Sequence, residues 1–223
     1  ETFQANFYGV YGLTETTGSV SRLEAEDHDP GGPKAELLRS VGKPSNGHDI
    51  KVMNTETGTE LSESEVGEIW IRGPQVMRGY WRNQEATAEA IDNEGWFRSG
   101  DAGYMKDGYL YIHDRVKDMI ISGAENIYPA EIENVLMTHA GVSDVAVIGV
   151  PDETWGEAVK ALVCRSDQSL SEAELIEYCR QRIAHYKCPS SIDWLQQLPR
   201  NPSGKILKTE LRQPYWKGRA RNV

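Results

Sequence analysis

The chain has 223 residues, of which 39% are hydrophobic and 26% charged, and its formal net charge is −10. This composition is typical of a globular protein with room for one large or two modest domains, and the negative charge argues against binding to nucleic acid. No apolar run approaches the ~18 residues of a membrane span. The three cysteines have no metal-ligand spacing, and their odd number argues against a closed disulfide framework.

The first half of the chain has the period-2 pattern of β-strands. Residues 1 to about 35 read as a short strand-and-loop segment. Apolar residues then alternate with polar ones at 50–52, 68–72 and 109–112, and turns rich in Gly, Asn and Asp separate these runs. The pattern predicts a β-rich subdomain over roughly residues 36–114.

After Lys117 the pattern changes to alternating helices and strands. Pro129 stands at the first position of one predicted helix. A second helix is predicted after Ser171, which together with Glu174 has the spacing of a capping box. Three strands are predicted around these helices, at residues 142–150, 157–164 and 191–195. The second half of the chain therefore reads as a compact α+β unit.

The segment from Tyr11 to Glu15 has the sequence YGLTE. Tyr11 offers an aromatic platform for a purine base, Thr14 a hydroxyl for phosphate oxygens, and Glu15 a hard oxygen ligand suited to Mg²⁺. The simpler alternative is a turn at Gly12 that is capped by Thr14 and Glu15.

Asp101 and Arg115 are candidates for binding a ribose. One carboxylate can accept hydrogen bonds from both ribose hydroxyls, and a guanidinium group supplies fixed donors beside it. Gly100 would allow the backbone to approach a ligand closely. The alternative is an aspartate in a surface turn, with Arg115 paired to Asp114 or Asp118.

Lys205 follows a flexible glycine in the run Asn201-Pro202-Ser203-Gly204-Lys205. A mobile ammonium group can bridge a carboxylate and a phosphate while negative charge shifts between them. The alternative is a solvated lysine in a surface turn.

Two further motifs are GWFRSGD at 95–101 and ISGAENIYP at 121–129. In this order and at these intervals, all these motifs together resemble the carboxyl-terminal part of the adenylate-forming superfamily. Acyl-CoA synthetases, peptide-synthetase adenylation domains and firefly luciferase form this family. The resemblance implies an α/β and α+β fold. Residues 1–116 would be the β-rich end of the large adenylating domain, including a β-barrel-like subdomain. Residues 117–223 would be a small mobile α+β domain that carries the catalytic lysine.

The resemblance also implies the roles of individual residues. Lys205, Thr14 and Glu15 would be catalytic, and Glu15 would bind the metal. Lys117 would be the hinge between the two domains. Gly123 and Ala124 would line the tunnel for the CoA thiol, where many relatives have a second glycine in place of Ala124. The nucleotide would be bound by Tyr11, Gly12, Thr14, Asp101 and Arg115.

The implied function is that of an ATP-dependent acid–CoA ligase, closest to fatty-acyl-CoA synthetases. It would use ATP, Mg²⁺ and CoA to convert a fatty or aryl carboxylic acid into acyl-AMP and then acyl-CoA. Two alternatives remain: an adenylation domain that loads a carrier-protein thiol, and a non-catalytic module that binds a nucleotide or a partner.

Family members normally have a few hundred residues before the Tyr11 motif. We therefore expect a fragment that needs the N-terminal portion of the same enzyme as its partner and is inactive alone. We expect a cytoplasmic location, and membrane association is left open. Ser203-Gly204-Lys205 also resembles sites of regulatory lysine acylation, which leaves open whether a lysine acyltransferase acts on Lys205.

Overall fold

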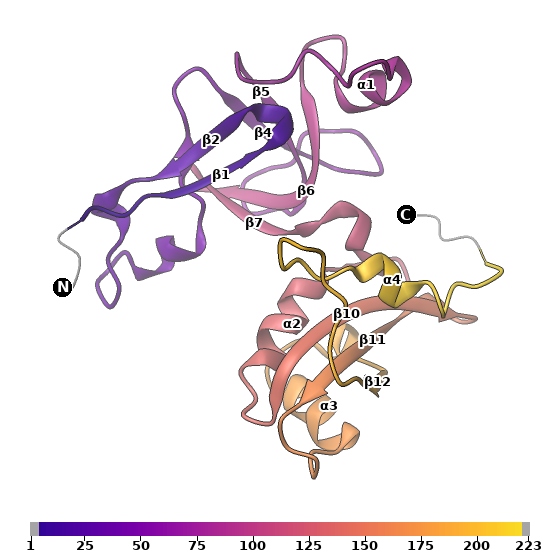
Figure 1. The fold of residues 1–223 in the computed structure, drawn as a ribbon. Helices are drawn as coiled ribbons and strands as arrows, with labels where there is room; N and C mark the ends of the chain where they lie inside the picture. Colours follow the sequence, from indigo (N-terminus) through magenta and orange to yellow (C-terminus); the bar gives the residue numbers. More distant parts are fainter. Residues whose placement is uncertain (1–4, 220–223) are drawn as a thin grey trace. The chain divides into compact units, whose positions relative to one another are not determined.

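Two units, residues 1–116 and 117–223, make up the chain, and the computed structural model describes residues 5–219 (Figure 1). Each unit contains both strands and helices, so the predicted mixed α/β fold class is confirmed. No helix within the described residues is long and apolar enough to cross a membrane.

Two antiparallel sheets build the first unit. The three-stranded sheet has the order β1-β2-β3 and the four-stranded sheet the order β4-β5-β6-β7. Their strands are β1 (Gly9–Leu13), β2 (Gly18–Leu23), β3 (Lys43–Pro44), β4 (Asp49–Met53), β5 (Gly67–Arg72), β6 (Phe97–Lys106) and β7 (Tyr109–Arg115). Backbone hydrogen bonds of 2.8 Å from Val41 to Leu110 and from Leu110 to Gly42 join the segment before β3 to β7.

Period-2 alternation explains how these strands form a core. Along β5, Ile69 and Ile71 are completely buried, while Glu68 and Trp70, which alternate with them, are partly exposed. They pack with Val20, Phe97 and Leu110 from three other strands. Helix α1 (Gln84–Ala90), which the sequence analysis did not predict, begins at Asn83, whose side chain accepts from the Ala86 N–H.

A mostly antiparallel sheet forms the second unit, with the order β10-β11-β8-β9 and with β12 parallel to β11. The strands are β8 (Ile120–Ser122), β9 (Glu125–Ile127), β10 (Val142–Asp152), β11 (Gly156–Arg165) and β12 (Ser191–Trp194). The long β10 and β11 pair along nearly their full length. The three strands predicted here are therefore present, and the hairpin of β8 and β9 adds to them.

Both faces of this sheet are covered. Val145 and Val147 point to the face that packs against α2 (Pro129–Met137) and α3 (Glu172–Arg180). Ala146 and Ile148 point to the other face, which Leu198 and Leu211 cover. Leu211 lies on α4 (Lys208–Arg212), a helix that the sequence analysis did not predict (Figure 1). Burial of both faces explains why residues 145–150 read as a nearly continuous apolar run.

At the start of α3, the hydrogen bond from the backbone of Glu174 to the Ser171 side chain is formed, as the capping-box spacing predicts. The Ser171 hydroxyl accepts from the Glu174 N–H at 3.2 Å. Glu172 links α3 to the sheet, because its Oε1 accepts from the Ile192 N–H of β12 at 2.8 Å. The cap thus serves the helix, and the neighbouring carboxylate ties the helix to the sheet.

A two-residue turn of Gly123 and Ala124 joins β8 to β9. Both residues have positive φ, +59° and +68°, as in a type I′ hairpin turn. A Cβ at Gly123 would lie 2.6 Å from Trp155 Cε3, so any larger residue would force the Trp155 side chain to shift. Ala124 adopts the left-handed conformation with a Cβ, at a cost of about 1 kcal/mol.

We expect Ala124→Gly to raise the free energy of unfolding by roughly 0.5–1 kcal/mol, because glycine removes the left-handed penalty but gains entropy when unfolded. Gly123→Ala should lower it by more than ~1 kcal/mol, through φ and the contact with Trp155. Urea denaturation followed by circular dichroism measures both changes. A loss of stability in Ala124→Gly would contradict this description of the turn.

Candidate functional site

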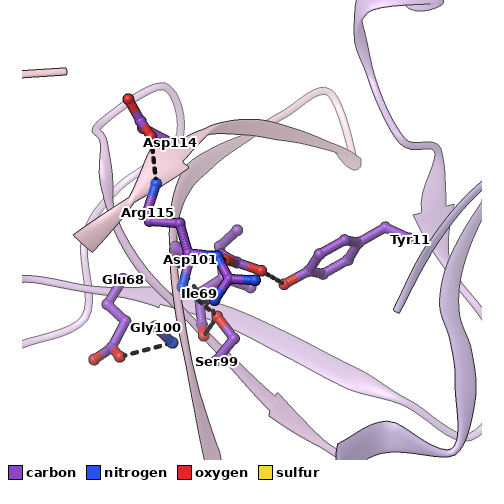
Figure 2. Close-up of polar contacts among 8 residues, drawn as sticks. All are labelled: Tyr11, Glu68, Ile69, Ser99, Gly100, Asp101, Asp114 and Arg115. Atoms are coloured by element: carbon purple, nitrogen blue, oxygen red, sulfur yellow. Dashed lines mark hydrogen bonds and ion pairs between the residues drawn. The ribbon is translucent and has the colours of Figure 1, made fainter. Parts of the chain in front are cut away.

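The carboxylate of Asp101 is the centre of a polar cluster in the first unit (Figure 2). The Tyr11 hydroxyl donates to Asp101 Oδ2 at 2.7 Å, and Arg115 Nε lies 2.9 Å from Oδ1. Asp101 on β6 and Arg115 on β7 are direct partners in the sheet register, while Tyr11 comes from β1. The structure therefore brings together three of the predicted nucleotide-binding residues.

Burial makes this cluster electrostatically tight. The Asp101 side chain is only 9% exposed, whereas the Arg115 side chain is 47% exposed. Burial, followed by the charge of Asp101, raises the pKa of the Tyr11 phenol far above its usual value. Tyr11 therefore stays a neutral hydrogen-bond donor to Asp101. The guanidinium group of Arg115 pairs with Asp101, and Asp114 Oδ1 accepts from the backbone N–H of Arg115 at 2.7 Å.

Hydrogen bonds with β5 hold the backbone of β6 just before Asp101. Ser99 Oγ donates to the Ile69 carbonyl at 2.6 Å and accepts from the Asp101 N–H at 3.0 Å. The Gly100 N–H donates to Glu68 Oε1 at 3.1 Å (Figure 2). Gly100 has φ +69°, and an added Cβ would meet no atom within 4 Å. Within the chain, glycine is needed here for its conformation rather than for space.

Thr14 and Glu15 follow Tyr11 in the 3₁₀ turn between β1 and β2. Thr14 is exposed, and Glu15 Oε1 accepts from the Tyr80 hydroxyl at 3.0 Å. Gly12 has a structural reason to be glycine, because a Cβ would lie 2.0 Å from the Gly18 carbonyl oxygen. Thr16, not Thr14, caps the turn through hydrogen bonds with Leu13.

Glu15 is suited to bind a magnesium ion whose other ligands come mainly from the phosphates of a nucleotide. Within residues 5–219, no group of three or more Asp, Glu, His or Cys side chains could hold a metal. Mg²⁺ bound with a nucleotide needs only one or two protein carboxylates, since phosphates and waters supply the other ligands. The half-exposed carboxylate of Glu15 beside the exposed hydroxyl of Thr14 meets this requirement.

Lys205 lies in an exposed loop of the second unit that Asn201 organises. Asn201 Oδ1 accepts from the backbone N–H groups of Ser203 and Lys205 at 3.0 and 2.9 Å, and from Ser203 Oγ at 2.8 Å. The Asn201 N–H donates to the Lys205 carbonyl at 2.9 Å, and Gly204 has φ +85°. No hydrogen bond or ion pair engages Lys205 Nζ in the described part of the chain. The loop is ordered while the ammonium group remains available.

Asp144 of β10 anchors this loop to the sheet. Arg200 donates through Nη1 to the Gly204 carbonyl at 2.7 Å and through Nη2 to Asp144 Oδ2 at 2.6 Å. One guanidinium group thus connects a strand of the core to the residue before Lys205. Asp144 was not predicted from the sequence, because 56 residues separate it from Arg200.

Gly123 lines a cavity of about 450 Å³ in the second unit, together with Ser122, Trp155, Tyr186 and Cys188. Trp155 and Tyr186 are 60% and 53% exposed, so the cavity has an accessible aromatic wall. Cys188 is buried, and burial raises the pKa of its thiol. Of the two predicted tunnel residues, Gly123 lines this cavity, whereas Ala124 follows it in the turn and is not among the lining residues.

Lys117 begins the second unit, next to a nearly buried ion pair. Arg212 Nη2 lies 2.6 Å from Asp118 Oδ1, and Arg212 Nη1 donates to the Lys117 carbonyl at 3.1 Å. Asp118 is therefore a partner of Arg212 and not of Arg115. The hinge role of Lys117 stays a prediction.

Several supporting residues were not predicted from the sequence. Tyr80 is 65 residues from Glu15, and Glu68, read as a plain strand residue, is 32 residues from Gly100. No local spacing reveals such contacts. Asn201 carried a usable signal, since Asn followed by Pro-Ser-Gly is typical of a turn that the asparagine side chain closes.

Two family models match the chain. Residues 1–81 match "AMP-binding enzyme", and residues 131–205 match "AMP-binding enzyme C-terminal domain". Among curated relatives, "Long-chain-fatty-acid--CoA ligase FadD13" of Mycobacterium tuberculosis is 46% identical over 206 residues, which are 92% of this chain and 39% of the relative. "Fatty acid--[acyl-carrier-protein] ligase ScoC" of Streptomyces coeruleorubidus is 43% identical over 219 residues, 97% of this chain and 41% of the relative.

Among solved structures, the chain is similar to o-succinylbenzoate coenzyme A synthetase (MenE) from Bacillus subtilis in complex with ATP and a magnesium ion. The TM-score is 0.80 and the identity 38%, over 92% of this chain and 41% of that one. The chain thus spans about 40% of the length of each of these relatives.

The raised pKa of Tyr11 predicts how stability changes at high pH. Because the folded pKa exceeds the unfolded value of 10.0, its contribution is fully present below pH 10 and is lost as pH rises toward the folded pKa. Between pH 10 and 11 the loss from Tyr11 should be about 1 kcal/mol. Tyr11→Phe should therefore lose that much less stability over this interval than the unaltered chain does.

Urea denaturation at both pH values measures this difference. Tyr8→Phe, at an exposed tyrosine, serves as the control and should retain the full loss. Equal losses in Tyr11→Phe and the unaltered chain would refute the hydrogen bond between the phenol and Asp101.

Proposed function

Because the chain belongs to the adenylate-forming superfamily, we propose that it is the carboxyl-terminal portion of an ATP-dependent acid–CoA ligase. The cluster of Asp101, Arg115 and Tyr11 is the observation that carries this proposal. It presents one buried carboxylate with a half-exposed guanidinium group beside it, which suits the two hydroxyls of a ribose.

The reaction activates a carboxylic acid in two steps. A carboxylate oxygen attacks the α-phosphorus of ATP, the bond to the bridging oxygen of the β-phosphate breaks, and pyrophosphate leaves. The CoA thiol, after losing its proton, then attacks the acyl carbon, and AMP leaves with the shared oxygen. Both steps need stabilisation of negative charge at the reacting phosphate and carboxylate oxygens.

The residues of this chain divide these tasks. Asp101 and Arg115 would hold the ribose, Tyr11 and Gly12 would border the adenosine, and Thr14 would donate to phosphate oxygens. Glu15 would hold Mg²⁺, which neutralises phosphate charge when bound. Lys205 would bring its unpaired ammonium group to the reacting carboxylate and α-phosphate. The similarity to a synthetase solved with ATP and a magnesium ion supports this assignment.

For the acid, we propose a hydrophobic monocarboxylate, either fatty or aryl. The relative FadD13, a long-chain-fatty-acid–CoA ligase by name, supports a fatty acid and a place in lipid metabolism. The cavity beside Gly123 and Ala124 would admit the thiol of CoA. We also propose a cytoplasmic location, since ATP and CoA are available there.

A second candidate function has its own support. ScoC is named for an acyl-carrier-protein acceptor and is similar over nearly this whole chain. A carrier-protein thiol is therefore the alternative to free CoA. A non-catalytic nucleotide-binding role is less well supported, because Asp101, Arg115 and Lys205 are all present and Lys205 is exposed.

We further propose that Lys205 is open to regulatory acylation by a lysine acyltransferase. Its exposed position in a loop, beside Gly204, is compatible with entry into an enzyme's active site. Acylation would remove the charge that adenylation requires.

The test of the proposed function uses the intact ligase that contains this sequence. Pyrophosphate and AMP release are measured with fatty, aryl and amino acids, ATP and Mg²⁺, before and after adding CoA or an acylatable carrier protein. We expect the highest kcat/KM for a fatty acid and a CoA-dependent rise in AMP. Response to the carrier protein alone would favour the alternative acceptor, and no response to any acid would overturn the enzyme assignment.

Lys205→Ala in the intact ligase should slow acyl-AMP formation by at least ~10²-fold, the usual effect of losing one preorganised charge-stabilising donor. Thiolysis of supplied acyl-AMP should be spared. Asp144→Asn should slow adenylation by about tenfold, because Arg200 then holds the Gly204 carbonyl less firmly. Asp144→Glu should restore part of the rate.

Glu131→Gln is the matched control for Asp144→Asn. Glu131 pairs with Lys187 at 2.7 Å, and its side chain is 28% exposed, as is that of Asp144. It should leave both half-reactions unchanged. If Asp144→Asn slowed both half-reactions equally, its role would be in folding and not in positioning Lys205.

A further inference from the structure

A pocket of about 760 Å³ in the first unit lies outside the cluster around Asp101. The turn at residues 78–82, the start of α1 and the start of β6 form its walls. Its lining includes three arginines, Arg78, Arg82 and Arg98, and two aromatic residues, Tyr80 and Trp81. Trp81 is 87% exposed. The site described above uses only Tyr80 from this set.

The three guanidinium groups have no carboxylate partner among residues 5–219. By contrast, Arg72 and Arg115 of the same unit each pair with an aspartate. Asp92 also lines the pocket, but its Oδ1 accepts from the backbone N–H groups of Glu94 and Trp96, both at 2.9 Å. The pocket therefore concentrates positive charge on a chain whose net charge is −10.

The turn that carries two of these arginines is fixed and strained. Arg82 has φ +52°, a conformation that costs a non-glycine residue about 1 kcal/mol or more. The Tyr80 N–H donates to Thr87 Oγ1 at 2.9 Å. Gly79 has φ +145°, and a Cβ there would lie 2.6 Å from Thr87. The chain thus maintains an unfavourable arrangement that faces the pocket.

The pocket adjoins the proposed metal ligand. Tyr80 lines the pocket, and its hydroxyl donates to Glu15 Oε1 at 3.0 Å. The Met77 N–H, at the start of the same turn, donates to the Glu15 carbonyl at 2.7 Å. A single phenol ring therefore separates the Glu15 carboxylate from the pocket that the arginines line.

We propose that this pocket binds the pyrophosphate released by adenylation, through Arg78, Arg82 and Arg98. The proposal rests on the proposed function, which makes pyrophosphate the leaving group next to Glu15. Guanidinium groups bind phosphate oxygens with paired, charge-assisted hydrogen bonds, so an anion with two phosphates matches several arginines better than a single phosphate does. The pocket would hold the product after the Pα–O bond is broken.

Isothermal titration calorimetry with the 223-residue chain and sodium pyrophosphate tests this directly, with inorganic phosphate and AMP as comparison ligands. We expect pyrophosphate to bind more tightly than inorganic phosphate, and its affinity to fall as salt is raised. Arg78→Gln combined with Arg98→Gln should weaken pyrophosphate binding by about tenfold or more. AMP binding should not change.

Arg72→Gln is the matched control, because Arg72 is an exposed arginine of the same sheet outside the pocket. It should leave pyrophosphate binding unchanged, and thermal melts should show that all variants are folded. An equal effect of Arg72→Gln would indicate only general electrostatics and would overturn the proposal. The absence of pyrophosphate binding would also overturn the proposal. If the chain then bound anionic lipid vesicles through the same arginines, the pocket would be a lipid-binding site instead.

In the intact ligase, the double variant should raise the KM for pyrophosphate in ATP–pyrophosphate exchange and leave the KM for ATP unchanged. The calorimetric result needs no turnover. If the proposed function is wrong, the intact ligase will show no acid-dependent reaction. If the pocket proposal is wrong, the chain will show no pyrophosphate binding.

Discussion

One buried carboxylate, that of Asp101, determines how the first unit presents its functional groups. Desolvation of a charge is costly unless donors surround it, and here the Tyr11 phenol and the Arg115 guanidinium group supply them. These donors come from separate strands, so satisfying one charge fixes β1, β6 and β7 against each other. The geometry that stabilises the carboxylate also leaves Arg115 half exposed beside it.

The second unit solves a different problem, which is to hold a flexible cation in place. In the proposed function Lys205 would have to reach a substrate, yet a lysine side chain has high rotamer entropy. The chain restricts the backbone and leaves the side chain mobile: Asn201 closes the loop, and Arg200 ties Gly204 to Asp144 on β10. The backbone from which the ammonium group extends is therefore held in place. In the proposed function, a backbone held in this way would reduce the reorganisation needed to bring the ammonium group to the developing charge.

Sequence patterns predicted those parts of the structure that depend on local periodicity and turns. The strand around Ile69 follows from alternation, the strand around Val147 follows from its β-branched apolar run, and the start of α3 follows from Ser171. Helices α1 and α4 were missed, because each is at most two turns long and its apolar contacts come from distant strands. The contacts of Tyr80 with Glu15 and of Asp144 with Arg200 depend on tertiary folding, and no spacing in the sequence records them. Gly123 was predicted to be small for a substrate, whereas its positive φ and its contact with Trp155 already favour glycine.

Burial on both faces of the β10–β11 hairpin has a consequence for how the segment around Lys205 responds to cleavage. Leu198 lies before the exposed loop and Leu211 after it, and both are buried in the same apolar cluster on the sheet. A protease that cuts the chain after Lys205 would therefore leave two ends that remain attached by noncovalent packing. The nicked protein would migrate as one species in size-exclusion chromatography and separate into two fragments only in denaturant. Cleavage of the peptide bond in the loop would therefore not release the C-terminal fragment under native conditions.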